Sequence, residues 1–288
     1  MKRPRSLSPR GDLLGYLLFS HGWSWVFWGI VVVMGWDAFA SPGVFFLIVG
    51  GTGPMLGGIV MSWVVGGSSE LTDLRHRMTD PRRIPARWWP VVVGFFPAVT
   101  AGTALLAIGL GVTGQPITLG EASELFVSPP ALLSTAVFIL ILGPLPEEIG
   151  WRGYLLDRLQ LRWGALTASL LVGIVWLSWH GPLFLMQGYY DSFGGPPNPF
   201  TFATGVVVVS IFYTWVHNNT HRSLLAAIIF HFSQNFTGQV FDLTLAASVM
   251  QAVIFVISAG VVVLLWGPKE LRQRGKRPHN WQFDWGQQ

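Results

Sequence analysis

The stretch Glu147-Glu148-Ile149-Gly150-Trp151-Arg152 decides how the rest of the chain is interpreted, because it places two carboxylates and a guanidinium inside a long apolar run. A charge at the centre of a bilayer costs about 2.5–3.5 kcal/mol on insertion scales, and such residues usually face the interior of a helix bundle and serve a function. Their clustering here indicates a polar site inside a membrane protein.

The composition of the whole chain supports this interpretation. Its 288 residues are 51% hydrophobic and only 11% charged, whereas a soluble domain is about 25% charged. We therefore predict an all-α fold and a single transmembrane domain over residues 1–288, with basic tails at 1–12 and 267–288. Cysteine is absent, which excludes disulfides, thiolate metal sites and a cysteine nucleophile.

Eight apolar runs predict a polytopic bundle of eight transmembrane helices. They cover about residues 13–36, 44–65, 89–110, 130–159, 163–186, 200–217, 223–240 and 246–266. All 18 Lys and Arg except Arg152 then fall in segments on the side of the two termini, and the opposite loops carry only acids. The positive-inside rule predicts a cell-membrane protein with both termini in the cytoplasm. The net charge of +4 follows from these basic loops, so we expect the lipid bilayer, and no nucleic acid, as a partner.

Distances along the chain place four ionisable side chains at similar depth. The fourth and fifth runs turn near Trp163-Gly164, and Glu147 lies about as far before that turn as His180 lies after it. His231 lies nine residues after Arg222, and Glu148 lies nine residues before Asp157, or roughly 13 Å of helix in each case. All four are therefore expected in the cytoplasmic half of the membrane.

Helical spacing predicts which of these side chains pair. Glu148 and Arg152 are four residues apart and share a helix face, so we expect an ion pair. Glu147 is turned about 100° away and remains available for other contacts. His231 and Asn235 also lie one above the other on their helix.

The same spacing joins Trp176 to His180 on the fifth run. Pro182 is expected to break that helix just beyond His180. Pro144 and Pro146 are expected to break the fourth run just before the glutamates. Such breaks are tolerated in a membrane where the backbone lines a polar cavity.

These groups form a set that could hydrolyse a peptide bond. Glu147 could act as a general base on water with His180 as its partner, while His231 and Asn235 could face the oxyanion. The sequence has no Gly-x-Ser-x-Gly elbow, no His-Glu-x-x-His zinc helix and no Gly-x-Gly-Asp pattern.

The three motifs resemble those of the CPBP family, which covers type II CAAX prenyl proteases and bacteriocin-processing enzymes and is also called the Abi family. They are Glu147-Glu148-x-x-x-Arg152, Trp176-x-x-x-His180 and His231-x-x-x-Asn235, in the family's order, over about residues 130–240. One departure is Trp176, where the family more often has Phe; we expect it to change the shape of the pocket and not the chemistry.

This resemblance implies an intramembrane glutamic endopeptidase acting on a membrane-associated protein or peptide substrate. It makes Glu147 the base that activates water and His180 its partner. It assigns His231 and Asn235 to the oxyanion hole, with Glu148, Arg152 and Trp176 in support. No cofactor or metal is implied, and nothing in the sequence sets an oligomeric state.

Two alternatives remain open. Glu147, Glu148, His180 and His231 would also be a plausible zinc ligand set, although Arg152 already claims one of the carboxylates. The same buried groups could instead serve a non-catalytic binding or regulatory protein, or a proton-coupled carrier. Outside the motifs, we expect His217 and His221 to be interfacial and His21 to be structural.

Overall fold

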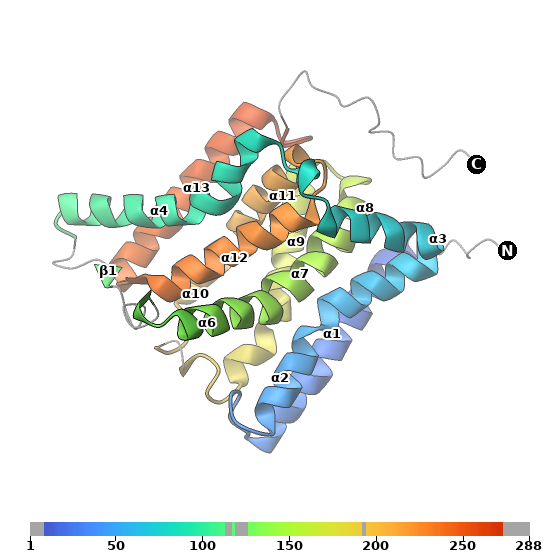
Figure 1. Cartoon of the computed structure of the whole chain (residues 1–288), viewed down its shortest axis with the longest axis horizontal. Coiled ribbons are helices and arrows are strands. Elements are labelled where there is room, and N and C mark those ends of the chain that lie inside the picture. Colours follow the sequence, from blue (N-terminus) through green and yellow to red (C-terminus); the bar gives the residue numbers. More distant parts are fainter. Residues whose placement is uncertain (1–8, 113–116, 119–125, 192–193, 273–288) are drawn as a thin grey trace.

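The computed structural model describes residues 9–112, 117–118, 126–191 and 194–272, and over these residues the chain is a bundle of helices (Figure 1). The first half comprises α1 (Pro9–Met34), α2 (Gly43–Gly51), α3 (Gly53–Thr79), two short 3-10 helices (Pro81–Arg83 and Ala86–Trp88) and α4 (Trp89–Gly109).

The second half carries the three motifs. It comprises α6 (Pro129–Leu142), α7 (Pro144–Gly150), a π-helical segment (Trp151–Leu155), α8 (Leu156–Gln160), α9 (Ala165–Trp179), a 3-10 helix (Gly181–Leu185), α10 (Pro199–Ala203), a second π-helical segment (Thr204–Val208), α11 (Val209–Asn219), α12 (Leu224–Val240) and α13 (Leu245–Trp266). Two short strands, β1 (Ile117–Thr118) and β2 (Asp242–Leu243), pair in antiparallel fashion.

Seven helical stretches of the described chain are long and apolar enough to cross a membrane. They contain α1, α2 with α3, α4, α6 to α8, α9 with its 3-10 helix, α10 with α11, and α13. The eighth predicted span is α12, whose 17 residues make about 26 Å of helix. It packs against α3, α4, α6, α7 and α11. The all-α membrane bundle is thus confirmed, with α12 as a shorter central helix.

Helix breaks occur where proline predicts them. α6 ends at Leu142, and Pro144 opens α7 after Gly143, whose φ of −124° and ψ of −85° are not helical. α9 ends at Trp179, and Pro182 stands in the 3-10 helix that follows. Both breaks lie beside residues of the predicted motifs.

Small residues bring α3 against α7. A Cβ added at Gly58 would lie 3.0 Å from the carbonyl oxygen of Ile149, and one at Gly150 would overlap the carbonyl oxygen of Pro54 and the hydroxyl of Tyr16. The backbones therefore touch, as small residues permit between membrane helices. The segment that carries the glutamates is therefore held by α3 and by Tyr16 of α1, which lie in a part of the chain where the sequence revealed no motif.

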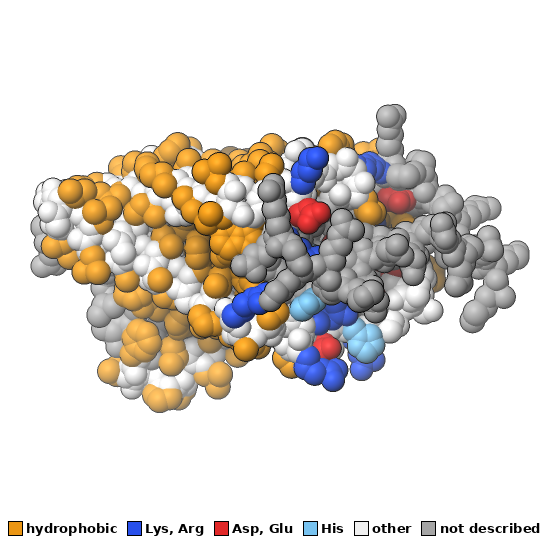
Figure 2. All heavy atoms as spheres, turned by 90° about the horizontal axis from the view of Figure 1, so that it is seen from above, with side chains coloured by type: hydrophobic (Ala, Val, Ile, Leu, Met, Phe, Trp, Pro, Cys, Tyr) orange, Lys and Arg blue, Asp and Glu red, His pale blue; other side chains and the backbone are white. Residues whose placement is uncertain are grey.

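The surface separates apolar from charged side chains. On the face drawn in Figure 2, hydrophobic side chains cover most of one part, and Lys, Arg, Asp, Glu and His gather toward the opposite part. Large apolar side chains such as Val33, Leu105 and Leu264 are 85%, 71% and 85% exposed, as expected of surfaces that contact lipid.

The described basic segments lie together at one end of the bundle. Arg77 donates to the carbonyl oxygen of Arg222 (2.9 Å), and Arg83 to that of His221 (2.9 Å). The backbone N–H of Ala165 donates to the carbonyl oxygen of Lys269 (2.8 Å). These contacts agree with the predicted sorting of the loops. The tails at 1–8 and 273–288 lie outside the described residues.

Candidate active site

The break at Gly143 sets the position of the first glutamate. Glu147 lies in the first turn of α7, its backbone N–H donates to the carbonyl oxygen of Gly143 (3.1 Å), and its side chain is only 5% exposed. Because α7 starts inside the bundle, it presents this carboxylate to an internal space and not to lipid.

Glu148 and Arg152 form the predicted ion pair. Arg152 donates from Nη1 to Glu148 Oε1 over 2.8 Å, and both side chains are fully buried. A buried pair of this kind is costly to break, because removing one partner leaves the other charge uncompensated.

The guanidinium of Arg152 is enclosed by aromatic rings. It stands 4.1 Å from the ring centroid of Tyr213 and 5.1 Å from that of Trp176. Its Nη2 donates to the hydroxyl of Ser210 (3.2 Å). Cation–π contacts of this kind gain strength when they are shielded from water.

Trp176 binds Glu147 directly. Its indole N–H donates to Oε2 of the carboxylate, and both side chains are buried. Phenylalanine could not make this hydrogen bond, so this tryptophan also adds a polar contact to the site, and the expectation that it leaves the chemistry unchanged stays a prediction.

His180 is fixed at the end of α9. Its Nδ1 lies 2.8 Å from the carbonyl oxygen of Trp176. A carbonyl can only accept, so Nδ1 carries the proton and donates, and Nε2 is the nitrogen left for other contacts.

His231 reaches the second glutamate from α12. Its Nδ1 is 2.9 Å from Glu148 Oε1, the same oxygen that accepts from Arg152. Helical spacing predicted the bond to Arg152 but not this one between two helices. Glu148 thus supports the site through His231 as well as through Arg152.

Asn235 and Glu147 approach one another beside Gly143. A Cβ added at Gly143 would lie 3.0 Å from Asn235 Nδ2 and 3.7 Å from Glu147 Oε1. The amide donor and the carboxylate oxygen not bound by Trp176 therefore border the same small space, which is open because residue 143 has no side chain.

One cavity of about 790 Å³ unites the predicted residues. Its lining includes Glu147, Trp176, His180, His231 and Asn235. Three separate stretches of the chain therefore converge on it, as their similar predicted depth in the membrane indicated. Glu148 and Arg152 do not line the cavity but contact residues that do. Among the described residues, no group of three or more His, Asp or Glu side chains is arranged to hold a metal ion, so the geometry does not favour a zinc site.

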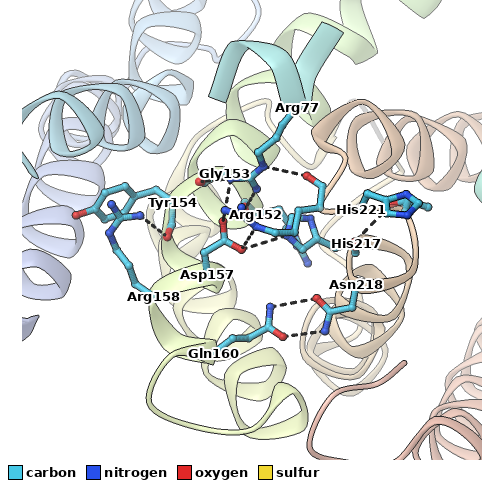
Figure 3. Close-up of polar contacts among 12 residues, drawn as sticks. Arg77, Arg152, Gly153, Tyr154, Asp157, Arg158, Gln160, His217, Asn218 and His221 are labelled. Atoms are coloured by element: carbon cyan, nitrogen blue, oxygen red, sulfur yellow. Dashed lines mark hydrogen bonds and ion pairs between the residues drawn. The ribbon is translucent and has the colours of Figure 1, made fainter. Parts of the chain in front are cut away.

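A second buried network lies at the basic end of the bundle (Figure 3). Asp157 accepts from Arg77 (2.8 Å) and Arg222 (2.5 Å), and His217 lies 3.3 Å from it. His217 is fully buried, so the expectation of an interfacial residue is wrong for it. His221 is partly buried, and its Nδ1 lies 2.9 Å from the carbonyl oxygen of Arg83.

Arg77 connects this network to the motif segment. It donates to the carbonyl oxygens of Arg152 (3.0 Å) and Gly153 (3.3 Å), which belong to the π-helical segment Trp151–Leu155. Sequence reasoning missed this role, because a basic residue near a cytoplasmic loop is ordinarily solvated.

His21 has a structural setting, as expected. Its Nε2 lies 3.2 Å from the hydroxyl of Ser178 and 3.3 Å from the carbonyl oxygen of Val175, which joins α1 to α9.

Comparisons with known proteins agree with this geometry. Residues 129–237, which contain all three motifs, match the family described as type II CAAX prenyl endopeptidase Rce1-like. The chain is also 31% identical over 199 residues to CAAX prenyl protease 2 of Methanococcus maripaludis, an alignment that covers 66% of this chain and 70% of that protein.

The chain belongs to the type II CAAX prenyl endopeptidase family. Membership in this family and the apolar helices together identify a multi-pass membrane protease whose substrates are membrane-associated proteins. The alignment of 199 residues is longer than the 109 residues (129–237) that match the family.

Proposed function

We propose that this protease hydrolyses a peptide bond with a water molecule activated by Glu147. The observation that carries the proposal is the convergence of Glu147, His180, His231 and Asn235 on one internal cavity. Trp176 holds one oxygen of the Glu147 carboxylate, which leaves Oε1 toward the space beside Gly143.

The attack step uses Glu147 and His180. A water between them gives a proton to Glu147 while its oxygen bonds to the carbonyl carbon of the substrate. Nε2 of His180 orients the same water, because Nδ1 is bound to a backbone carbonyl. The tetrahedral intermediate carries the negative charge on the former carbonyl oxygen.

The oxyanion is stabilised by His231 and Asn235. Asn235 donates from Nδ2, and His231, whose ring is held through Nδ1 by Glu148, turns its Nε2 toward the same oxygen. Collapse of the intermediate breaks the C–N bond, and Glu147 returns its proton to the leaving amine. The carboxylate is thereby regenerated without a covalent intermediate.

The substrate we propose is a membrane-associated protein or peptide with a lipidated C-terminal segment. The Methanococcus relative is named a CAAX prenyl protease, and such a substrate carries a prenylated cysteine followed by two aliphatic residues and a terminal residue. The cavity is bordered by aromatic and aliphatic side chains next to the polar groups, which suits a ligand with both kinds of surface.

The proposed orientation places both termini and the basic end of the bundle in the cytoplasm. Support comes from the described basic segments, which meet at one end, as the positive-inside rule requires of cytoplasmic loops.

A comparison of membrane and secreted peptides from cells with the wild-type protein and with Glu147→Gln tests the function. We expect peptides that appear only with wild type, because the amide cannot accept the proton of water. Identical peptide profiles, with equal amounts of folded protein, would contradict the proposal.

The zinc alternative has its own outcome. Cleavage by the purified protein should be unaffected by a chelator. A loss of activity that zinc restores would favour a metal-bound water over Glu147.

A further inference from the structure

The cavity extends past the proposed catalytic residues to polar groups that the mechanism does not use. Gln234 of α12, Thr100 of α4 and Gln251 of α13 all border it. When a substrate displaces water from the cavity, these polar side chains lose hydrogen bonds unless the substrate supplies new ones. Their orientation indicates which partner fits.

Gln234 is held by its carbonyl end. The hydroxyl of Tyr213 donates to Gln234 Oε1 over 2.6 Å. Tyr213 is itself fully buried, with Arg152 over its ring and His231 5.5 Å away in an edge-on contact. The N–H₂ end of Gln234 has no hydrogen-bond partner among the residues that the structure describes.

Gln251 is held by its opposite end. Its Nε2 donates to the hydroxyl oxygen of Thr100 over 2.9 Å, and Thr100 is buried. Over the described chain, Oε1 of Gln251 has no donor within hydrogen-bond distance. The cavity therefore contains one oriented amide donor and one oriented amide acceptor.

A donor and an acceptor of this kind complement the C=O and N–H groups of a peptide main chain. A prenyl chain offers neither group, so the two carboxamides would not recognise the lipid. Gln234 also lies three residues after His231 on α12, a spacing that puts both on one helix face, and the two border the same cavity as Asn235. It is thus placed beside the groups that would face the scissile carbonyl.

We propose that Gln234 and Gln251 bind the main chain of the substrate peptide, Gln234 by donating to a carbonyl oxygen and Gln251 by accepting from an N–H. Tyr213 and Thr100 are positioning residues that hold the two carboxamides. This inference rests on the proposed function, because it places the peptide in the same cavity as Glu147.

Binding to a cleavage-deficient protein tests the proposal. Glu147→Gln, purified in detergent, is titrated with a fluorescent peptide ending in a farnesylated Cys-aliphatic-aliphatic-X sequence. Adding Gln234→Met or Gln251→Met should raise Kd about threefold to tenfold, the effect of one lost hydrogen bond. The exposed Gln187 gives the matched control, because Gln187→Met should leave Kd within twofold.

Modified peptides separate recognition from general damage. The backbone nitrogens of the peptide are methylated one at a time. At one position, methylation should raise Kd for Glu147→Gln but should not raise Kd further for the protein that also carries Gln251→Met. Tyr213→Phe keeps the ring and should raise Kd as Gln234→Met does. Kd is measured well below the melting temperature of every variant, so that all the protein compared is folded.

The inference is overturned if the peptide does not bind Glu147→Gln, or if both glutamine variants bind it as tightly as their parent. It is also overturned if, at every methylated position, N-methylation raises Kd by the same factor with and without Gln251→Met. The proposed function fails separately, if Glu147→Gln cleaves the same peptide at the wild-type rate.

Discussion

Glu148 is the residue on which the local structure of the site depends most. Its Oε1 accepts from Arg152 of the same helical stretch and lies 2.9 Å from Nδ1 of His231 on α12. Its Oε2 is buried without a hydrogen-bond partner in the part of the chain that the structure describes. A single carboxylate therefore joins two motifs, and loss of its cation would leave a buried charge.

Arg152→Ala should destabilise the protein as well as reduce cleavage. Removing the guanidinium from this buried ion pair should cost about 3–5 kcal/mol, which thermal unfolding in detergent would detect as a large fall in Tm. The control is Arg82→Ala, whose side chain is 89% exposed beside Asp80, and which should leave Tm unchanged. Equal Tm values for both variants would contradict the buried pair.

Trp176→Phe should reduce cleavage while the protein stays folded. Phenylalanine preserves an aromatic ring but removes the indole N–H that Glu147 accepts, and one lost hydrogen bond to a charged group corresponds to about 1.5–3 kcal/mol. We expect a fall in kcat of at least tenfold. Trp163, which is 42% exposed, provides the matched tryptophan control. A kcat unchanged by Trp176→Phe would show that the indole N–H does not position Glu147.

At this scale, the sequence predicted contacts within one helix better than contacts between helices. The pairing of Glu148 with Arg152 follows from a spacing of four residues, and the structure confirms it. The bond from His231 to Glu148 and the burial of His217 against Asp157 depend on how separate helices pack. No periodicity in the chain encodes those relations.

At the scale of elements, α7 is short and held at both ends. It begins after the break at Gly143, and it ends in the π-helical segment whose carbonyls accept from Arg77. π-helical turns occur frequently at functional sites. The contact with α3 at Gly150 completes this support.

Gly150→Ala should destabilise the bundle. The added methyl would overlap the carbonyl oxygen of Pro54, and overpacking of this kind costs about 1–3 kcal/mol. Gly102→Ala in α4 is the matched control, because nothing lies within 4 Å of its Cβ position and alanine is the better helix former. Thermal unfolding in detergent should therefore show a lower Tm for Gly150→Ala alone, and a Tm equal to wild type would contradict the close α3–α7 contact.

The helix breaks were predictable because proline imposes them locally. Pro144 and Pro182 stand where the structure ends one helical stretch and begins another. The support that α3 gives to the motif segment was not predictable. It consists of close packing against α7 and of the buried guanidinium of Arg77. Arg77 resembles its exposed neighbours in sequence and differs from them only in the folded bundle.

At the scale of the whole molecule, the eight predicted spans correspond to seven long apolar helices and the shorter α12. The described basic segments gather at one end, and apolar side chains cover much of the rest of the face drawn in Figure 2. The proposed orientation follows from this separation and from the positive-inside rule.

Single cysteines test the orientation cleanly, because the chain has no cysteine of its own. Arg82→Cys, at the basic end, should react with an impermeant maleimide only after the membrane is opened. Asp191→Cys, in an exposed loop outside the spans, should react in intact cells. The reverse labelling pattern would contradict the cytoplasmic placement of the basic end.

The rate at which purified Glu147→Gln cleaves a prenylated Cys-aliphatic-aliphatic-X peptide tests the central claim most directly. If Glu147 activates water, kcat should fall about 10²–10⁴-fold, the usual contribution of a general base, while Tm and peptide affinity stay near the wild-type values. A folded Glu147→Gln protein that retains kcat within tenfold of wild type would contradict the account.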